Sequence, residues 1–299
     1  MIARRRFLAI SAAAALSGSA SGARAAPRRW RGRALGAEVG ITLDVNAERF
    51  DRLVSMVTAE LRRMEKLFSL YDPGSDLSRL NRAGYLDRPP PEMVELLGAV
   101  GRLHRATGGR FDPTVQPLWA ALARSGDVAA ARRQIGWNRV AIGADRIRLG
   151  PGQALTLNGI AQGYATDRVA ALLRAQGLVK VLVNIGEFSA TGGPWRIGIE
   201  DPTHGLVAIR ELRDTAIATS SPAAMILPDG RAHILDPLGG ADRAHSSTIS
   251  VQARNATLAD GLSTALCLVP LAEAREILRR LPDVEQVICV DDSGAVAQI

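Results

Sequence analysis

The spacing of apolar residues changes along this chain, and it predicts where helices and strands lie. Between residues 50 and 68 apolar side chains recur mostly three and four positions apart, the stripe of an amphipathic helix. Similar spacing predicts a second helix that follows the prolines at 89–91 and stops at Gly108-Gly109. Further helices are predicted over residues 164–176, 258–268 and 271–281.

Short runs rich in β-branched residues separate these helices. They predict a hairpin from 139–142 and 146–149, and further strands over 181–185, 195–199, 216–219, 248–252 and 286–290. Strands and helices do not alternate in a regular βαβ order, which favours an α+β fold with mixed, largely antiparallel sheets and packed helices. No internal repeat or long low-complexity linker interrupts the chain, so we expect residues 26–299 to form a single domain.

The first 25 residues read as a signal peptide. Arg4-Arg5, one further residue and Phe7-Leu8 match the twin-arginine form, and a short apolar run leads to a small-x-small cleavage pattern. The alternatives are a membrane anchor or a generic signal, but the apolar run is too short to span a bilayer. We therefore expect export by the twin-arginine machinery to the periplasm.

Removal of this segment changes what the charge of the chain implies. Residues 1–25 hold four arginines and no acid, so a formal charge of +7 falls to +3. No basic run alternates with aromatic residues, so a nucleic-acid partner is not expected. Cys267 and Cys289 both lie in apolar stretches, and either two buried thiols or one disulfide fits that pattern.

Candidate chemistry is concentrated in four motifs. These are residues 71–81 (Tyr-Asp-Pro-Gly-Ser-Asp-Leu-Ser-Arg-Leu-Asn), 109–115 (Gly-Arg-Phe-Asp-Pro-Thr-Val), 155–167 (Leu-Thr-Leu-Asn-Gly-Ile-Ala-Gln-Gly-Tyr-Ala-Thr-Asp), and 233–237 (His-Ile-Leu-Asp-Pro) followed by 259–264 (Ala-Asp-Gly-Leu-Ser-Thr). In the third motif, Gly159 and Gly163 allow close backbone approach, and the helix that follows offers its positive end to a diphosphate. A lone glycine pair could equally serve an ordinary turn.

In their order and composition the four motifs, with residues 195–202 between them, resemble the ApbE family of FAD:protein FMN transferases along nearly the whole mature chain. The resemblance implies a T-fold-like architecture and an enzyme that cleaves FAD with Mg²⁺. It further implies transfer of FMN to a threonine or serine of an acceptor flavoprotein, with release of AMP. The FAD-binding residues that it implies are Tyr71, Arg110, Phe111, Asp112, Thr156, Gln162 and Ile234.

The expected metal site lies around Asp260 and Thr264. On the predicted helix these two residues are four positions apart, so their oxygens project from one face. Such hard oxygen donors suit Mg²⁺, although a solvated Asp and a Thr bonded to a backbone carbonyl would have the same spacing. The resemblance favours the metal and adds the backbone carbonyl of Gly159 and the side chain of Ser263.

His233 is the candidate general base. A hydroxyl that attacks phosphorus must lose its proton, and the ordinary pKa of histidine suits that task. The alternative is a loop histidine that only shapes the FAD pocket. Intact His233, Asp260 and Thr264 favour an enzyme over a non-catalytic flavin-binding assembly protein, but they do not separate transfer from hydrolysis by an FAD pyrophosphatase.

Three positions depart from the family pattern. Thr156 stands where Asp is common, Gln162 where Lys or Glu is common, and Glu187-Phe188 where Gly-Asp usually follows Gly186. Loss of an acid and a base six residues apart could remove a mutual ion pair, so we expect the site to remain active. The residues 158–163 (Asn-Gly-Ile-Ala-Gln-Gly) also resemble, more loosely, a twin-arginine-exported subgroup associated with nitrous oxide respiration, which suggests a nitrous oxide reductase maturation flavoprotein as the acceptor.

Overall fold

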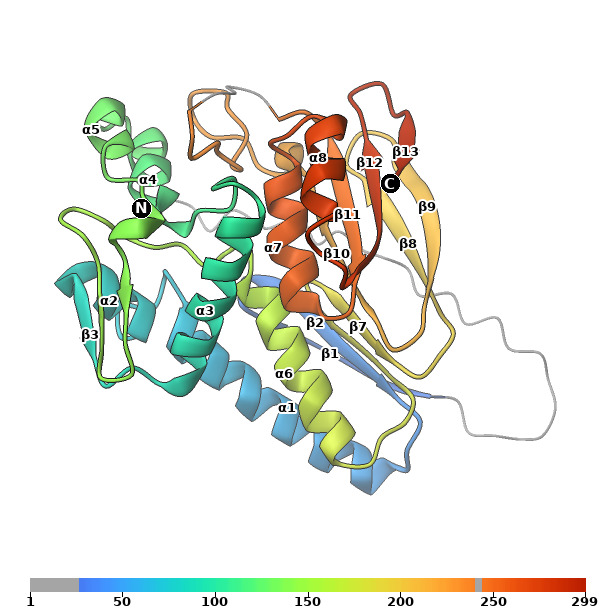
Figure 1. Cartoon of the computed structure of the whole chain (residues 1–299). Helices are drawn as coiled ribbons and strands as arrows, with labels where there is room; N and C mark the ends of the chain where they lie inside the picture. The colour runs from blue at the N-terminus through green and yellow to red at the C-terminus, as the bar shows by residue number, and fades with distance from the viewer. Residues whose placement is uncertain (1–26, 240–243) are drawn as a thin grey trace.

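A computed structural model describes residues 27–239 and 244–299 (Figure 1). The predicted signal peptide lies outside the described residues. The helices are α1 (Ala47–Phe68), α2 (Asp76–Ala83), α3 (Pro91–Ala106), α4 (Gln116–Arg124), α5 (Val128–Arg132), α6 (Ala161–Ala175), α7 (Ala256–Leu266) and α8 (Leu271–Leu278). The strands are β1 (Arg28–Ala34), β2 (Ala37–Leu43), β3 (Tyr85–Asp87), β4 (Ala141–Ile142), β5 (Arg146–Arg148), β6 (Val181–Ile185), β7 (Phe188–Thr191), β8 (Trp195–Asp201), β9 (Gly205–Leu212), β10 (Ala216–Ser220), β11 (Thr248–Ala253), β12 (Val284–Val290) and β13 (Val296–Gln298).

The strands form one large sheet and two small ones. The large sheet has the order β1-β2-β6-β7-β10-β11-β12-β13, and the small sheets are β3-β5-β4 and β8-β9. Every pairing between these strands is antiparallel, so the predicted α+β class is confirmed. The predicted hairpin is present but shorter, because Arg139 ends a 3₁₀ turn instead of starting a strand.

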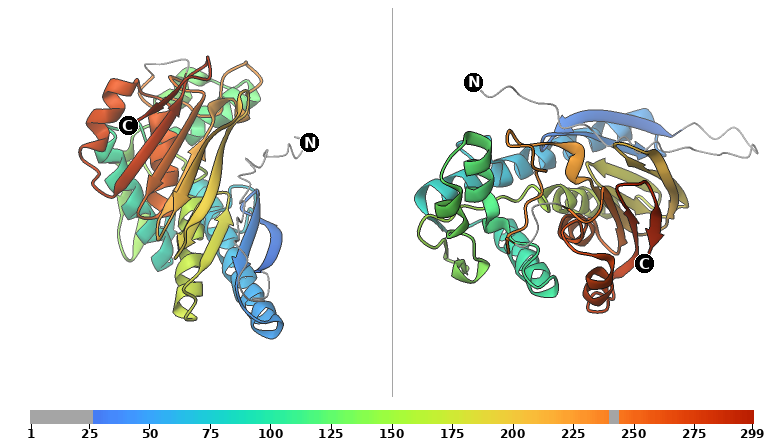
Figure 2. Two further views of the ribbon diagram at one scale, coloured as in Figure 1. Left: turned by 90° about the vertical axis from the view of Figure 1, so that its right-hand side faces the viewer. Right: turned by 90° about the horizontal axis from the view of Figure 1, so that it is seen from above.

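Helices cover one face of the large sheet, and the β8-β9 ribbon covers the other (Figures 1 and 2). Strand β6 shows how the sequence produces these two layers. Val181, Val183 and Ile185 are buried in the main core with the helices, whereas Leu182 is buried in a second core with the β8-β9 ribbon. Side chains alternate between the faces of a strand, so a continuous apolar run fits a strand with both faces covered.

Polar caps determine where the helices begin. Ser75, in the first motif, caps α2 by accepting a hydrogen bond from the Ser78 N–H at 3.0 Å. Asn255 caps α7 in the same way, with the Leu258 N–H at 2.8 Å. The cap on α7 fixes where the helix that carries Asp260 and Thr264 starts.

Cys267 and Cys289 are free and buried, so of the two possibilities that the sequence left open, the structure has two thiols and no disulfide.

Within residues 27–239 and 244–299, no helix combines the length and the apolar character that a membrane crossing requires.

Candidate active site

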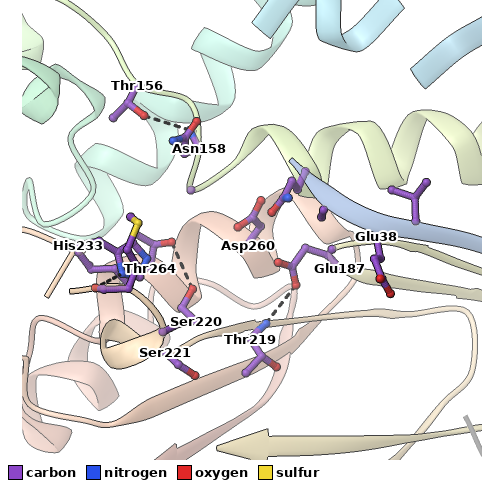
Figure 3. Close-up of a pocket in the computed structure, with 18 of the residues that line it drawn as sticks. Glu38, Thr156, Asn158, Glu187, Thr219, Ser220, Ser221, His233, Asp260 and Thr264 are labelled. Atoms are coloured by element: carbon purple, nitrogen blue, oxygen red, sulfur yellow. Dashed lines mark hydrogen bonds between the residues drawn. The ribbon is translucent and has the colours of Figure 1, made fainter. Parts of the chain in front are cut away.

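A cavity of about 1060 Å³ brings together residues from β1, β2, the second motif, the start of α6, α7 and the segment around His233. Of the twelve residues that the sequence predicts for the site, eleven line this cavity: Tyr71, Arg110, Phe111, Asp112, Thr156, Gly159, Gln162, His233, Ile234, Asp260 and Thr264. Residues as far apart in the chain as Tyr71 and Thr264 therefore line one cavity, part of which Figure 3 shows. Ser263 is the exception.

The crossing of α6 and α7 fixes Asp260. Its carboxylate is buried, and Oδ2 accepts a hydrogen bond from the Gly163 N–H at 2.9 Å. A Cβ on residue 163 would lie 2.7 Å from the Cβ of Asp260, so only glycine permits this approach. Gly163 thus allows α6 and α7 to pack closely, and its N–H orients the Asp260 carboxylate.

Thr264 lies one helical turn beyond Asp260 and against the backbone of Gly159. A Cβ on Gly159 would lie 2.9 Å from Oγ1 of Thr264, which shows how close the two residues are. A carboxylate, a hydroxyl and a glycine backbone therefore converge at the cavity wall, and hard oxygen donors of this kind fit Mg²⁺. No cluster of three or more His, Cys, Asp or Glu side chains suited to a metal occurs in the described part of the chain.

Ser263 is buried and does not line the cavity. Its hydroxyl donates to the backbone carbonyl of Asp260 at 2.9 Å and lies 2.7 Å from Oγ of Ser220. Ser220 does line the cavity, and its Oγ is 3.4 Å from Oγ1 of Thr264. Ser220, at the end of β10, therefore brings a hydroxyl to the cavity beside Thr264. Ser263 contacts that hydroxyl from within α7.

His233 is held by two backbone carbonyls. Its Nδ1 lies 3.1 Å from the carbonyl oxygen of Pro222 and 3.2 Å from that of Met225. Carbonyl oxygens only accept, so Nδ1 carries the proton and Nε2 of the neutral ring has the free lone pair. Burial lowers the pKa of His233, which keeps the ring neutral and able to accept a proton near pH 7.

Two buried carboxylates share the cavity, Asp260 and Glu187. Burial raises the pKa of Asp260 to about 7, against the effect of the Gly163 hydrogen bond. Burial and the nearby Asp260 also raise the pKa of Glu187, while the hydrogen bond from the Thr219 N–H opposes that shift. Both acids are therefore poorly solvated, and a positive charge between them would stabilise their ionised forms.

Residues of the second motif both line the cavity and stabilise the structure around it. Phe111 is buried in the wall, while Arg110 lies 3.1 Å from Asp236 and 3.4 Å from Glu273 as an ion pair with each. Asp112 lines the cavity, but its carboxylate accepts hydrogen bonds from the N–H and hydroxyl of Thr114 and from the Trp137 N–H. These hydrogen bonds show that Asp112 stabilises the turn in which it lies.

The remaining predicted FAD residues differ in how tightly they are held. Tyr71 is 71% exposed at the cavity and offers a free ring face. The Thr156 hydroxyl accepts from the Asn158 N–H at 3.3 Å, and Gln162 donates to the carbonyl of Leu35 at 3.2 Å. The two departures from the family pattern thus satisfy separate partners.

Comparison with known proteins identifies the family to which this chain belongs. A model of the ApbE family matches residues 35–288. The chain belongs to the ApbE family. It is 27% identical over 268 residues to the FAD:protein FMN transferase of Salmonella typhimurium, which covers 79% of this chain and 76% of the relative. The predicted family is confirmed, and so is the predicted class of enzyme, a transferase.

Solved ApbE structures agree with the fold of this family member. The apo form of the Pseudomonas stutzeri flavinyl transferase ApbE is 28% identical and aligns with a TM-score of 0.77 over 91% of this chain and 94% of that one. The ApbE protein of Thermotoga maritima aligns with a TM-score of 0.81 over 91% of this chain and 96% of that one, and at 24% identity it supports the fold alone.

Several cavity residues of this ApbE chain are not evident from the sequence motifs. They include Glu38, Thr219, Ser220 and Glu187 (Figure 3). The available signal for Ser220 is the polar pair Ser220-Ser221 between a β-rich run and Pro222. For Glu187 the signal is an acid next to Gly186, two positions after the predicted strand over 181–185.

Proposed function

We propose that this chain transfers FMN from FAD to a threonine or serine hydroxyl of an acceptor flavoprotein and releases AMP, with Mg²⁺ bound in the cavity. The observation that carries the proposal is the meeting of Asp260, Thr264 and the Gly159 backbone with a neutral His233 in one cavity. The name of the Salmonella typhimurium relative supports the same reaction.

The cavity suits FAD in size and lining. A volume of about 1060 Å³ is at the upper end of small-molecule sites, as a dinucleotide requires. Exposed Tyr71 offers a ring for stacking, and Phe111 gives an apolar wall. Helix α6 begins at the cavity with no side-chain cap, so its positive end can face the diphosphate.

The donor set supports a divalent ion beside that diphosphate. Asp260, Thr264 and the Gly159 backbone would hold it, with Ser220 close behind. Bound there, Mg²⁺ would neutralise charge that develops on the phosphates. The chain itself contributes the fixed carboxylate and hydroxyl, which the α6-α7 crossing holds in place before the substrate arrives.

His233 acts on the incoming hydroxyl. Its Nε2 accepts the proton of the acceptor threonine or serine as the oxygen attacks the FMN phosphorus, and the P–O bond to AMP breaks. The two carbonyls on Nδ1 fix the tautomer that this step requires. If water replaced the acceptor hydroxyl, the same geometry would hydrolyse FAD, which makes an FAD pyrophosphatase the second candidate.

The biological setting is also a proposal. The twin-arginine pattern at Arg4-Arg5 supports export to the periplasm, where the acceptor would be an exported or membrane flavoprotein. The Asn-Gly-Ile-Ala-Gln-Gly motif suggests a nitrous oxide reductase maturation flavoprotein as a first acceptor to try.

Intact-mass measurement of an acceptor domain tests the reaction. The mature protein, FAD and Mg²⁺ are incubated with the acceptor and with the same acceptor carrying Ala at its flavinylated position. We expect FMN on the first acceptor only, together with AMP. Free FMN and AMP at equal rates with both acceptors would instead identify a pyrophosphatase, and intact FAD in all samples would identify a non-catalytic binder.

A further inference from the structure

We propose that Glu187 supplies a second carboxylate to the divalent cation held by Asp260 and Thr264, so that the ion in this chain contacts two acids. This inference rests on the metal site of the proposed function.

The backbone directs Glu187 into the cavity. Gly186, with φ of +89°, forms the turn between β6 and β7, and a Cβ there would lie 2.9 Å from Cδ of Gln162. On β7 the next side chain, Phe188, is buried in the second core with the β8-β9 ribbon. Glu187 turns to the other side, toward Asp260 (Figure 3), and is 8% exposed.

Each acid has one oxygen held by the protein and one without a partner. Oε2 of Glu187 accepts from the Thr219 N–H at 3.1 Å, and Oδ2 of Asp260 accepts from the Gly163 N–H at 2.9 Å. Within the described residues, neither carboxylate forms a salt bridge, and neither second oxygen accepts a hydrogen bond. In their ionised forms, two buried acids held this way are costly unless a cation joins them.

The Thr219 N–H occupies one oxygen of the buried Glu187 carboxylate, and the side chain still lies toward Asp260 (Figure 3). A second ligand explains why the carboxylate is placed where it faces Asp260, because Mg²⁺ accepts one or two protein carboxylates.

Manganese binding to the mature protein, without FAD or acceptor, tests this role independently of activity. Mn²⁺ serves as the probe, and free Mn²⁺ is measured by electron paramagnetic resonance. We expect Glu187→Gln to weaken Mn²⁺ binding about ten-fold or more, since ligand charge sets affinity at such sites. The glutamine retains an oxygen for the Thr219 N–H, so the wall is preserved.

Glu38 provides the matched control. It lines the same cavity from β2 but is exposed, so Glu38→Gln removes the same charge without removing a ligand. We expect this control to change Mn²⁺ affinity less than about three-fold, since exposed charges are screened. Thermal melts without metal confirm that each variant is folded, and the Mn²⁺-induced rise in Tm gives a second reading of affinity.

Asp260→Asn separates failure of this inference from failure of the metal site. If Asp260→Asn weakens Mn²⁺ binding while Glu187→Gln matches Glu38→Gln, the metal site stands and Glu187 is not a ligand. If Asp260→Asn binds Mn²⁺ like the unaltered protein, the metal site of the proposed function is itself wrong, and the inference falls with it.

Discussion

The crossing of α6 and α7 at Gly163 gives the sharpest structural prediction. In Gly163→Ala the new Cβ would lie 2.3 Å from the carbonyl oxygen of Ala256 and 2.7 Å from the Cβ of Asp260. The carbonyl belongs to the first residue of α7, so the helices must separate to relieve the overlap. The Gly163 N–H that holds Asp260 would move with them.

The magnitude follows from two opposing effects. Overpacking of this kind costs about 1–3 kcal/mol, and replacing glycine by alanine within a helix recovers at most about 0.5–1 kcal/mol. We therefore expect a net loss of roughly 1–2 kcal/mol, or a fall in Tm of several degrees. Thermal denaturation measures the loss, and Mn²⁺ binding should weaken in the same variant.

Gly98→Ala is the matched control within α3. Its new Cβ would have its nearest neighbour at 3.8 Å, an Arg102 side-chain nitrogen, so no overlap arises. We expect this variant to be as stable as the unaltered protein or up to about 1 kcal/mol more stable. The reasoning would be refuted if Gly163→Ala melted at or above the temperature of Gly98→Ala.

Four further predictions concern export and catalysis. Replacing Arg4 and Arg5 by Lys should strand the protein in the cytoplasm, and mature protein still found in the periplasm by fractionation would reject the twin-arginine route. Asp260→Ala should abolish Mg²⁺-dependent FAD cleavage, followed as AMP release, while circular dichroism stays unchanged; retained cleavage would place the ion elsewhere. His233→Ala should slow single-turnover transfer by about 10²- to 10⁴-fold with little change in FAD affinity, whereas a parallel loss of affinity would indicate pocket shaping. Because burial lowers the pKa of His233, transfer should fall only as pH drops below the ordinary histidine range, when Nε2 gains a proton, and this acid limb should vanish in His233→Ala.

The spacing of apolar residues predicts a helix or strand correctly where those same residues are buried in the fold. The stripe over residues 50–68 lies within α1, and the run at 181–185 coincides with β6, since both bury what their spacing indicates. Strand β1 is not evident in the sequence, because arginines occupy most of it and its pairing with β2 depends on the turn at Leu35-Gly36. As an edge strand of the large sheet, it carries little apolar signal. No strand is predicted over β2 either, although its buried residues alternate along the strand.

The sequence likewise predicts only part of the site. Motif order predicts that Asp260, Thr264 and His233 share a cavity, but not which hydroxyl accompanies them. Ser220 is not predicted, because the end of β10 meets Ser263 on α7 only in the folded chain. Glu187 likewise acquires its neighbour Asp260 through the fold.

A crystal structure of the mature protein with FAD and Mn²⁺ tests the central claim most directly. Anomalous scattering locates the ion without reference to activity. The account predicts an anomalous peak within about 2.5 Å of the Asp260 carboxylate and of Oγ1 of Thr264, with the FAD diphosphate against it and the flavin phosphorus facing Nε2 of His233. An ion and a diphosphate bound away from Asp260 would contradict it.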